Sequence, residues 1–184
     1  IFSLFGVTCS SIICHDVRHP ELVRLPVLRG ARVIFYLSFE TWHDDGPVPR
    51  VESELNAYRA QVQARAVENR VWVIHGNVAG TGDPVTMGEG SHGSGRVVGP
   101  DGIVRCENST EMKMGEDGGI VDFVACEVDV NFATALYAKE SVGDAFFMAE
   151  WWREGAKKYV HEYSDGVDDF DLDSLGFQHC RNDA

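Results

Sequence analysis

Apolar residues follow two periods along this chain, one typical of buried strands and one typical of amphipathic helices. Largely apolar segments cover Val7–Ile13, Ala31–Leu37 and Val71–Ile74. Runs of this length, rich in β-branched and aromatic residues, are typical of strands buried between layers. Between the last two runs, Val51–Asn69 repeats an apolar residue every three or four positions, which predicts a helix. These elements indicate an α/β arrangement in the first half of the chain.

A shorter helix is expected between the first two strands. Pro20 and Glu21 suit a first helical turn, and Gly30 suits the residue after the last turn. Pro26 lies inside this segment and has no N–H to donate, so we expect it to kink or shorten the helix.

The second half of the chain is more strand-like, which extends the predicted class from α/β to α+β. Arg96–Val98 and Ile103–Cys106 flank a Gly-Pro-Asp-Gly turn and predict a hairpin. The remaining expectations, in chain order, are a long loop over Gly76–Gly95, a strand over Val121–Val130, and helices over Phe132–Lys139 and Phe146–Val160. The glycines of the loop precede no helix pattern, which argues against a phosphate cradle and a nucleotide cofactor.

Charge excludes two classes of partner. The 184 residues carry a formal net charge of -13, and an acidic surface repels both nucleic acid and anionic membranes. No stretch approaches the length of apolar chain needed to cross a bilayer. Many of the acidic residues crowd into the last 20 positions, which predicts a solvated end. The chain begins with Ile1 and enters an apolar run at once, as a piece of a longer protein would.

The cysteines point to a reducing compartment and to no metal. Five cysteines are scattered without close pairs, so we expect free thiols and a cytoplasmic location. Cys9 and Cys14 are an odd number of positions apart, which places them on opposite faces of one strand. No other Cys or His spacing resembles a zinc site, and no metal or cofactor is predicted.

Cys14 is the residue best placed for chemistry. It leaves an apolar strand and precedes a polar turn into a helix. A strand end is held rigidly, the backbone N–H groups after it face a cleft, and a nearby helix N-terminus favours thiolate over thiol. Cysteine is also among the most buried residue types, so its position alone favours a core thiol.

The residues around Cys14 favour the nucleophile. The segment from Cys14 to Glu21 resembles the nucleophile region of the nitrilase superfamily, with Cys14, Asp16, Arg18, Pro20 and Glu21 matching and with His15 and His19 standing where the family often has aromatic residues. Three later segments match in order, namely Arg29-Gly30-Ala31, Arg65–Asn69 and the hairpin Gly95–Gly102, although Gly95 stands where the family has serine. The resemblance runs from about Gly6 to Asp129.

The resemblance implies a four-layer α-β-β-α sandwich, of which this chain holds an incomplete version that lacks the N-terminal half. It implies a partial carbon-nitrogen hydrolase domain over residues 1–135 and a helical extension with an acidic tail over 136–184. It further implies hydrolysis of a small-molecule amide or nitrile, with an amidase favoured, by a protein that forms homo-oligomers when it is full length.

The same resemblance implies a role for each site residue. Cys14 is the nucleophile, and the backbone N–H of His15 binds the oxyanion. The turn is supported by Asp16, Arg18, Glu21, Arg65 and Glu68, and Arg18 is expected to form an ion pair with Glu68 or Asp16. In the family a Glu base and a Lys precede the cysteine, and none of the thirteen residues before Cys14 is Glu or Lys. The chain alone is therefore expected to be inactive.

Two other functions stay open on the sequence. A catalytically silent binding subunit would keep the same motifs without the chemistry. A Cys-His thiol hydrolase would instead pair Cys14 with a distant imidazole, either His75 or His43.

Overall fold

The computed structural model describes residues 1–39, 41–42, 50–77, 90–91, 93–108 and 123–143. The chain divides into two units, Ile1–Lys139 and Glu140–Ala184, and every residue predicted for the site lies in the first. The predicted helix over Phe146–Val160 and the acidic tail lie outside the described residues. The domain boundary predicted after residue 135 stays a prediction.

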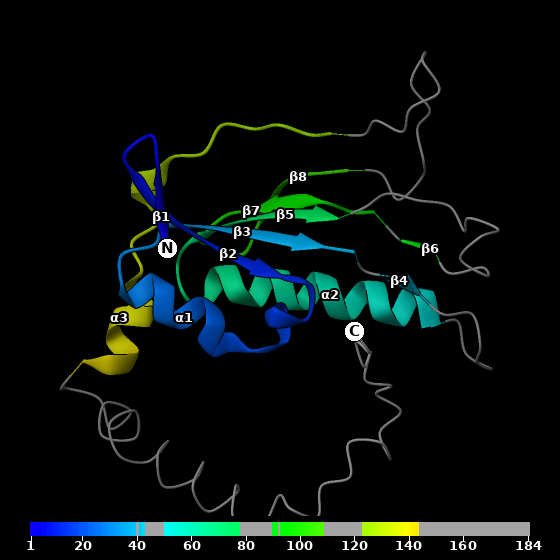
Figure 1. The fold of residues 1–184 in the computed structure, drawn as a ribbon, viewed down its shortest axis with the longest axis horizontal. Coiled ribbons are helices and arrows are strands. Elements are labelled where there is room, and N and C mark those ends of the chain that lie inside the picture. Colours follow the sequence, from blue (N-terminus) through cyan, green and yellow to red (C-terminus); the bar gives the residue numbers. More distant parts are fainter. Residues whose placement is uncertain (40, 43–49, 78–89, 92, 109–122, 144–184) are drawn as a thin grey trace, which may run out of the picture. The chain divides into compact units, whose positions relative to one another are not determined.

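The first unit is built on a mixed six-stranded sheet (Figure 1). Its strands, in spatial order, are β1 (Phe2–Leu4), β2 (Val7–Ile13), β3 (Val33–Ser38), β5 (Trp72–Asn77), β7 (Arg96–Val98) and β8 (Val104–Glu107). The three central strands β2, β3 and β5 run parallel, and each outer strand is antiparallel to its neighbour. A second sheet pairs β4 (Thr41–Trp42) with β6 (Gly90–Ser91).

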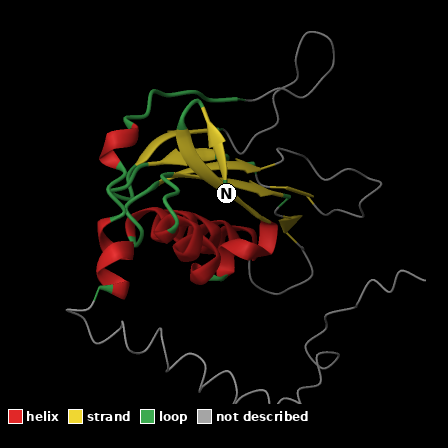
Figure 2. Cartoon of the chain, turned by 60° about the vertical axis from the view of Figure 1, so that its left-hand side comes forward, coloured by secondary structure: helices red, strands yellow, loops and turns green. Residues whose placement is uncertain are grey.

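The helices α1 and α2 cover one face of the larger sheet (Figure 2). The helical elements are the 3-10 turn η1 (Cys14–Arg18), α1 (Pro20–Leu28), α2 (Arg50–Val67), the 3-10 turn η3 (Val130–Phe132) and α3 (Leu136–Val142). No helix in the described ranges is both long enough and apolar enough to cross a membrane.

The core forms where the helical stripes meet alternate positions of the strands. A strand presents every second residue to one face, and a helix presents a stripe with a period of 3.6. The sheet contributes Ile12, Ile34, Tyr36, Val73 and Val98 to the helix-covered face, and the helices contribute Val23, Val27, Val62 and Ala66. This packing fixes which side of β2 faces the helices and so fixes the orientation of the turn that follows it.

Most of the local expectations are confirmed. β2 has the predicted bounds, the three parallel strands alternate with α1 and α2, and the hairpin of β7 and β8 forms around the predicted turn. The α/β class is therefore confirmed. Pro26 does not end α1, which continues to Leu28. Only the carbonyl four residues before a proline loses its donor, and near a helix end that loss is small.

Three expectations are wrong. No strand is present over residues 123–129, and Val130–Phe132 forms the turn η3. The next helix begins at Leu136, after Ala135 adopts a left-handed φ of 55° that no helix can contain. The predicted loop over Gly76–Gly95 contains the end of β5 and the short strand β6, while residues 78–89 and 92 lie outside the described ranges. The alternation of apolar and polar residues indicates which side of an extended chain each residue faces. It does not indicate whether a neighbouring strand is available for hydrogen bonding.

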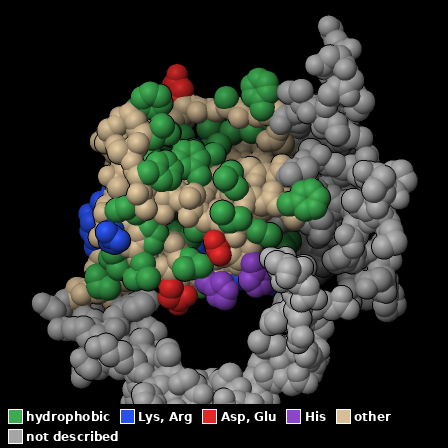
Figure 3. All heavy atoms as spheres, viewed as in Figure 1, with side chains coloured by type: hydrophobic (Ala, Val, Ile, Leu, Met, Phe, Trp, Pro, Cys, Tyr) green, Lys and Arg blue, Asp and Glu red, His purple; other side chains and the backbone are tan. Residues whose placement is uncertain are grey.

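The face of the sheet opposite the helices is apolar and partly open. Ile13 and its ladder neighbour Leu37 are exposed on this face, and Phe2 stacks on Phe35 with ring centroids 6.0 Å apart. Figure 3 shows hydrophobic side chains gathered over β1 and β2. Monomeric proteins rarely leave contiguous apolar patches in water, so this face is expected to associate with another apolar surface.

Replacing Leu37 by lysine is predicted to reduce self-association of the purified chain. Leu37 is 54% exposed on the open face, and Leu25 on α1 is 51% exposed, so Leu25→Lys is a matched control. We expect Leu37→Lys to lower binding of a hydrophobic dye and to shift elution toward the monomer in size-exclusion chromatography. Equal effects of the two substitutions would show that the sheet face has no special role.

Candidate active site

Cys14 lies where β2 gives way to the turn η1. It is the first residue of that 3-10 turn, and its φ of 48° is in the left-handed region that non-glycine residues rarely adopt. Its side chain is exposed and its thiol is free. Backbone strain at one residue persists only where the surrounding structure holds it, and such strain is common at nucleophiles. The local geometry thus presents a solvent-facing thiol at a rigid strand end.

Asp16 closes the turn through backbone hydrogen bonds. The backbone N–H of Ile13 donates to Asp16 Oδ2 at 2.9 Å, and the N–H of His19 donates to the Asp16 carbonyl oxygen at 3.0 Å. The carboxylate therefore caps the start of the turn that carries Cys14. A charge-assisted bond of this kind holds a turn more firmly than a neutral one.

Arg65 ties the turn to the end of α2. Its side chain is 7% exposed, its Nε donates to the Val17 carbonyl oxygen at 2.8 Å, and its Nη1 lies 2.8 Å from Glu68 Oε1. Asn69 and Arg24 extend these contacts: Arg24 Nε donates to Asn69 Oδ1 at 2.6 Å, and Arg24 Nη2 donates to the Glu68 carbonyl oxygen at 3.0 Å. The turn η1, α1 and α2 are thereby held to one another.

Arg18 does not form the ion pair that the sequence suggested with Glu68 or Asp16. Among the described residues its guanidinium meets Tyr58, with Nη2 3.4 Å from the hydroxyl oxygen and Cζ 6.0 Å from the ring centroid. Neighbouring residues of a 3-10 turn point about a third of a turn apart. Because Val17 is buried, Arg18 faces solvent, and Glu68 is left to Arg65.

His15 and Glu21 lie on the exposed side of the same region. The ring of His15 is 5.8 Å from that of His19, at an interplanar angle of 53°. Glu21 is exposed in the first turn of α1 and forms no ion pair within the described part of the chain. In a 3-10 turn that begins at Cys14, the N–H of His15 precedes the first bond of the turn, so it has no intrahelical acceptor.

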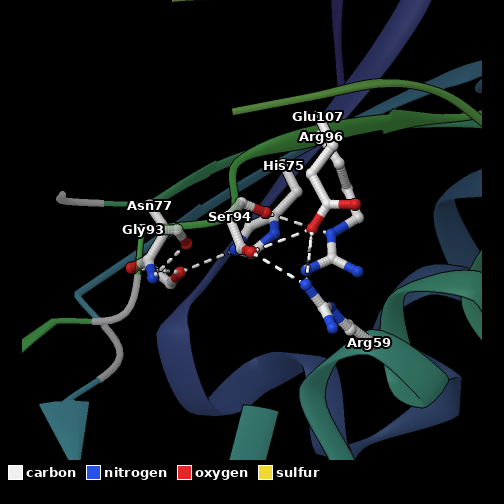
Figure 4. Close-up of polar contacts among 8 residues, drawn as sticks. Arg59, His75, Asn77, Gly93, Ser94, Arg96 and Glu107 are labelled. Carbon is white, nitrogen blue, oxygen red and sulfur yellow. Dashed lines mark hydrogen bonds and ion pairs between the residues drawn. The ribbon is translucent and has the colours of Figure 1, made fainter. Parts of the chain in front are cut away.

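A row of polar residues continues from Cys14 across the ends of the parallel strands. Ile13 pairs with Leu37, which places Cys14 level with Ser38, and Ser38 pairs in turn with Asn77. Ser38 Oγ donates to Asn77 Oδ1 at 3.1 Å. Asn77 Nδ2 donates in turn to the Gly93 carbonyl oxygen at 2.8 Å (Figure 4). Carboxyl ends of parallel strands are where open α/β sheets place their ligands.

His75 contacts Ser38 and Tyr36, and it does not pair with the Cys14 thiol. Its Nε2 lies 2.9 Å from Ser38 Oγ, and its ring stacks on Tyr36 with centroids 4.4 Å apart. No hydrogen bond joins Cys14 to His75 in the structure, and His43 lies outside the described residues. Within the described ranges no group of three or more His, Cys, Asp or Glu is arranged to hold a metal ion.

Glu107 organises a second polar cluster between α2 and the hairpin (Figure 4). Its Oε1 lies 3.0 Å from Arg59 Nη2 and 3.4 Å from Arg96 Nη2, and it accepts a hydrogen bond from Ser94 Oγ at 2.9 Å. Burial acts to raise the pKa of Glu107, but the Ser94 hydroxyl and the two guanidinium groups outweigh it and leave the pKa below its ordinary value. The sequence analysis missed this cluster and the strand-end row.

Arg65→Ala is predicted to lower the free energy of unfolding by about 1–3 kcal/mol, because it leaves the Val17 carbonyl and the Glu68 carboxylate without their donor. Arg18→Ala removes only an exposed contact and should cost about 0.5 kcal/mol or less. Chemical denaturation of the two variants measures both values. If Arg18→Ala lowered the free energy of unfolding more than Arg65→Ala, the result would favour the ion pair of Arg18 that the sequence suggested.

Glu107→Gln is predicted to flatten the loss of stability in acid. A carboxyl group with a lowered folded-state pKa stabilises the protein fully above its unfolded pKa, near 4.5, and this contribution is lost as the pH falls through the folded value. As the pH falls below about 4.5, the urea concentration at the midpoint of unfolding should therefore decrease more steeply for the wild-type protein than for Glu107→Gln. Parallel pH profiles for the two proteins would contradict the assignment.

Comparison with known proteins shows which family the chain resembles. The carbon-nitrogen hydrolase family model matches residues 2–121. The chain is 39% identical to the 2-oxoglutaramate amidase of Bacillus subtilis over an alignment of 80 residues. The alignment covers 44% of this chain and 27% of that protein.

Two solved structures share the fold. The NitFhit protein of C. elegans superposes with a TM-score of 0.54 and 27% identity over 72% of this chain and 27% of that one. The NitN amidase of Nesterenkonia sp. AN1 gives 0.52 and 25%, over 82% of this chain and 48% of that one. The chain thus spans from about a quarter to about half the length of these relatives. Because the family model matches more than half of its residues, the chain belongs to the carbon-nitrogen hydrolase family of the nitrilase superfamily.

Proposed function

We propose that Cys14 is the nucleophile of a carbon-nitrogen hydrolase that acts on a small-molecule amide. The observation that carries the proposal is the exposed, left-handed cysteine at the carboxyl end of β2, inside the region matched by the family model. A strand end that is held by packing and by hydrogen bonds on the following turn keeps a nucleophile in one orientation without a large reorganisation during the reaction.

The proposed reaction has two steps. The Cys14 thiolate attacks the amide carbon, and the carbonyl oxygen takes up negative charge, which the backbone N–H of His15 can bind because the turn makes no use of it. The amine leaves with a proton, and a thioester remains on the sulfur. Water then attacks the thioester carbon, releases the carboxylic acid and returns the thiol.

The substrate is proposed to lie over the row formed by Cys14, Ser38 and Asn77. Ser38 pairs with Asn77 at the carboxyl ends of β3 and β5, and Cys14 directly follows Ile13, which pairs with Leu37 of β3. Asp16, Arg65 and Glu68 hold the turn in place, and the exposed Arg18 and Glu21 lie at its rim. An amide is favoured over a nitrile because two of the relatives are named as amidases.

The chain alone is proposed to be inactive. A cysteine thiol has an ordinary pKa near 8.5 and needs a base or a nearby cation to attack at neutral pH. In the family a Glu and a Lys before the cysteine serve these steps, and the thirteen residues before Cys14 include neither. A catalytically silent subunit that retains the fold is the second candidate function. Homo-oligomers and a cytoplasmic location remain predictions.

Iodoacetamide is predicted to alkylate Cys14 faster than Cys126, the other exposed free cysteine among the described residues. The expectation rests on the proposed role of Cys14 as the nucleophile and on its exposed position at the start of the turn. Mass spectrometry of peptides after a short exposure measures the two rates. Equal rates, or faster reaction at Cys126, would remove the support for an activated thiol.

Ammonia release from simple aliphatic amides and from 2-oxoglutaramate tests the reaction itself. The 184-residue chain should give no turnover above that of its Cys14→Ala variant, and turnover that depends on Cys14 would overturn the proposed inactivity. A longer product of the same gene in which a Glu and a Lys precede Cys14 should hydrolyse an amide. Failure of that product, with Cys14 still quickly alkylated, would favour the silent subunit.

A further inference from the structure

The proposed reaction does not use Cys106 or Cys126. Cys106 packs against the apolar cluster on the open side of the sheet, and Cys126 lies two residues before Val128, which packs against the same cluster. Cys106 belongs to β8, which forms one edge of the six-stranded sheet, and Cys126 belongs to the segment 123–129. In both ribbon views this segment runs on the side of the sheet opposite α2 (Figures 1 and 2). Its far end is fixed where Trp72 Nε1 donates to the Asp129 carbonyl oxygen at 2.8 Å.

A β-bulge places Cys106 on the side of the sheet where this segment runs. Val97 pairs with Cys106 and Val98 pairs with Val104, so Arg105 has no partner in the ladder. An extra residue of this kind reverses the alternation of the strand. Val104 consequently packs against the core on the helix side, and Cys106 packs against the opposite cluster, which includes Val97 and Val128.

Cys126 belongs to the segment 123–129. It lies two positions before Val128, a spacing that puts both side chains on the same side of an extended chain, and Val128 packs against the same cluster as Cys106. Burial raises the pKa of the Cys106 thiol, and its interaction with the Cys126 thiol raises it further. Both thiols are free, with Cys126 exposed and Cys106 half-buried.

We propose that Cys106 and Cys126 form a reversible disulfide that fastens the segment 123–129 to the edge strand β8. The oxidant is a low-molecular-weight disulfide such as oxidised glutathione. The exposed Cys126 thiolate attacks it and releases one glutathione thiol, and the Cys106 thiolate then attacks the Cys126 sulfur and releases the second. Two protein thiols are oxidised to one disulfide, and one glutathione disulfide is reduced to two thiols.

The disulfide would join the segment 123–129 to β8, which here are otherwise linked by side-chain packing. The segment 123–129 forms no strand, so no backbone ladder holds it to β8. A covalent link between Cys106 and Cys126 restricts the unfolded chain and fixes the cover over the cluster around Trp72. Oxidation should therefore raise the midpoint of thermal unfolding and slow proteolysis between the segment and β8.

Treatment of the 184-residue chain with oxidised glutathione near pH 8 tests the proposal. Two of the five thiols should be lost, and peptide mapping should find Cys106 joined to Cys126. Reduced dithiothreitol should restore both thiols. Cys126→Ser should abolish the linked peptide. Cys14→Ser, which removes the other thiol that is exposed in the described part of the chain, should leave the yield of that peptide unchanged.

The proposal is overturned if Cys106 stays open to alkylation after the mixed disulfide has formed on Cys126, because the second exchange then does not occur. It is also overturned if disulfides involving other cysteines form in equal yield. Peptide mapping of the wild-type chain decides both points even if a serine variant fails to fold. Neither outcome bears on Cys14, so the proposed function is tested separately.

Discussion

The buried guanidinium of Arg65 fixes the turn that carries the nucleophile. An arginine cannot lose its charge in a protein, so a buried one must be given acceptors. The Val17 carbonyl on the turn and the carboxylate of Glu68, the residue after the end of α2, supply them at 2.8 Å each. Because one acceptor belongs to η1 and the other follows α2, satisfying this charge requires the turn and the helix to keep their present relation. The orientation of Cys14, three residues before Val17, follows from that requirement.

The parallel strands then decide what lies beside the thiol. Their crossover connections bring all three carboxyl ends to one edge, and the register places Ser38 and Asn77 in a row beyond Cys14. The hydrogen bonds from Ser38 to Asn77 and from Asn77 to Gly93 join β3, β5 and the entry to β7. The carboxyl ends of β3 and β5 thereby carry linked polar side chains.

One bulge separates two kinds of chemistry on the hairpin. Cys106 faces the segment 123–129, while its neighbour Glu107 faces α2 and binds Arg59 and Arg96. The helix side is held by charge and hydrogen bonds, and the open side is held by apolar packing and the Trp72 bond to Asp129. The two faces thus respond to different conditions, the first to acid and the second to the redox state of its thiols.

The sequence by itself determined the elements whose causes are local. Apolar runs fixed β2 to the residue, a three- and four-residue period located α2 within two residues of each end, and Gly-Pro-Asp-Gly fixed the turn of the hairpin. The exit of Cys14 from a strand followed from the same pattern. These features depend on side-chain spacing and backbone conformation within a few residues.

Only the tertiary structure decided which partners the polar residues take. Sequence spacing allowed either Arg18 or Arg65 to pair with Glu68, and the choice depends on which side of a 3-10 turn the core covers. The alternation in residues 121–130 was real, but no strand lay in position to bond the described part of that segment. Ser38, His75 and Asn77 meet because two parallel strands share a register, and register is set by packing between distant segments.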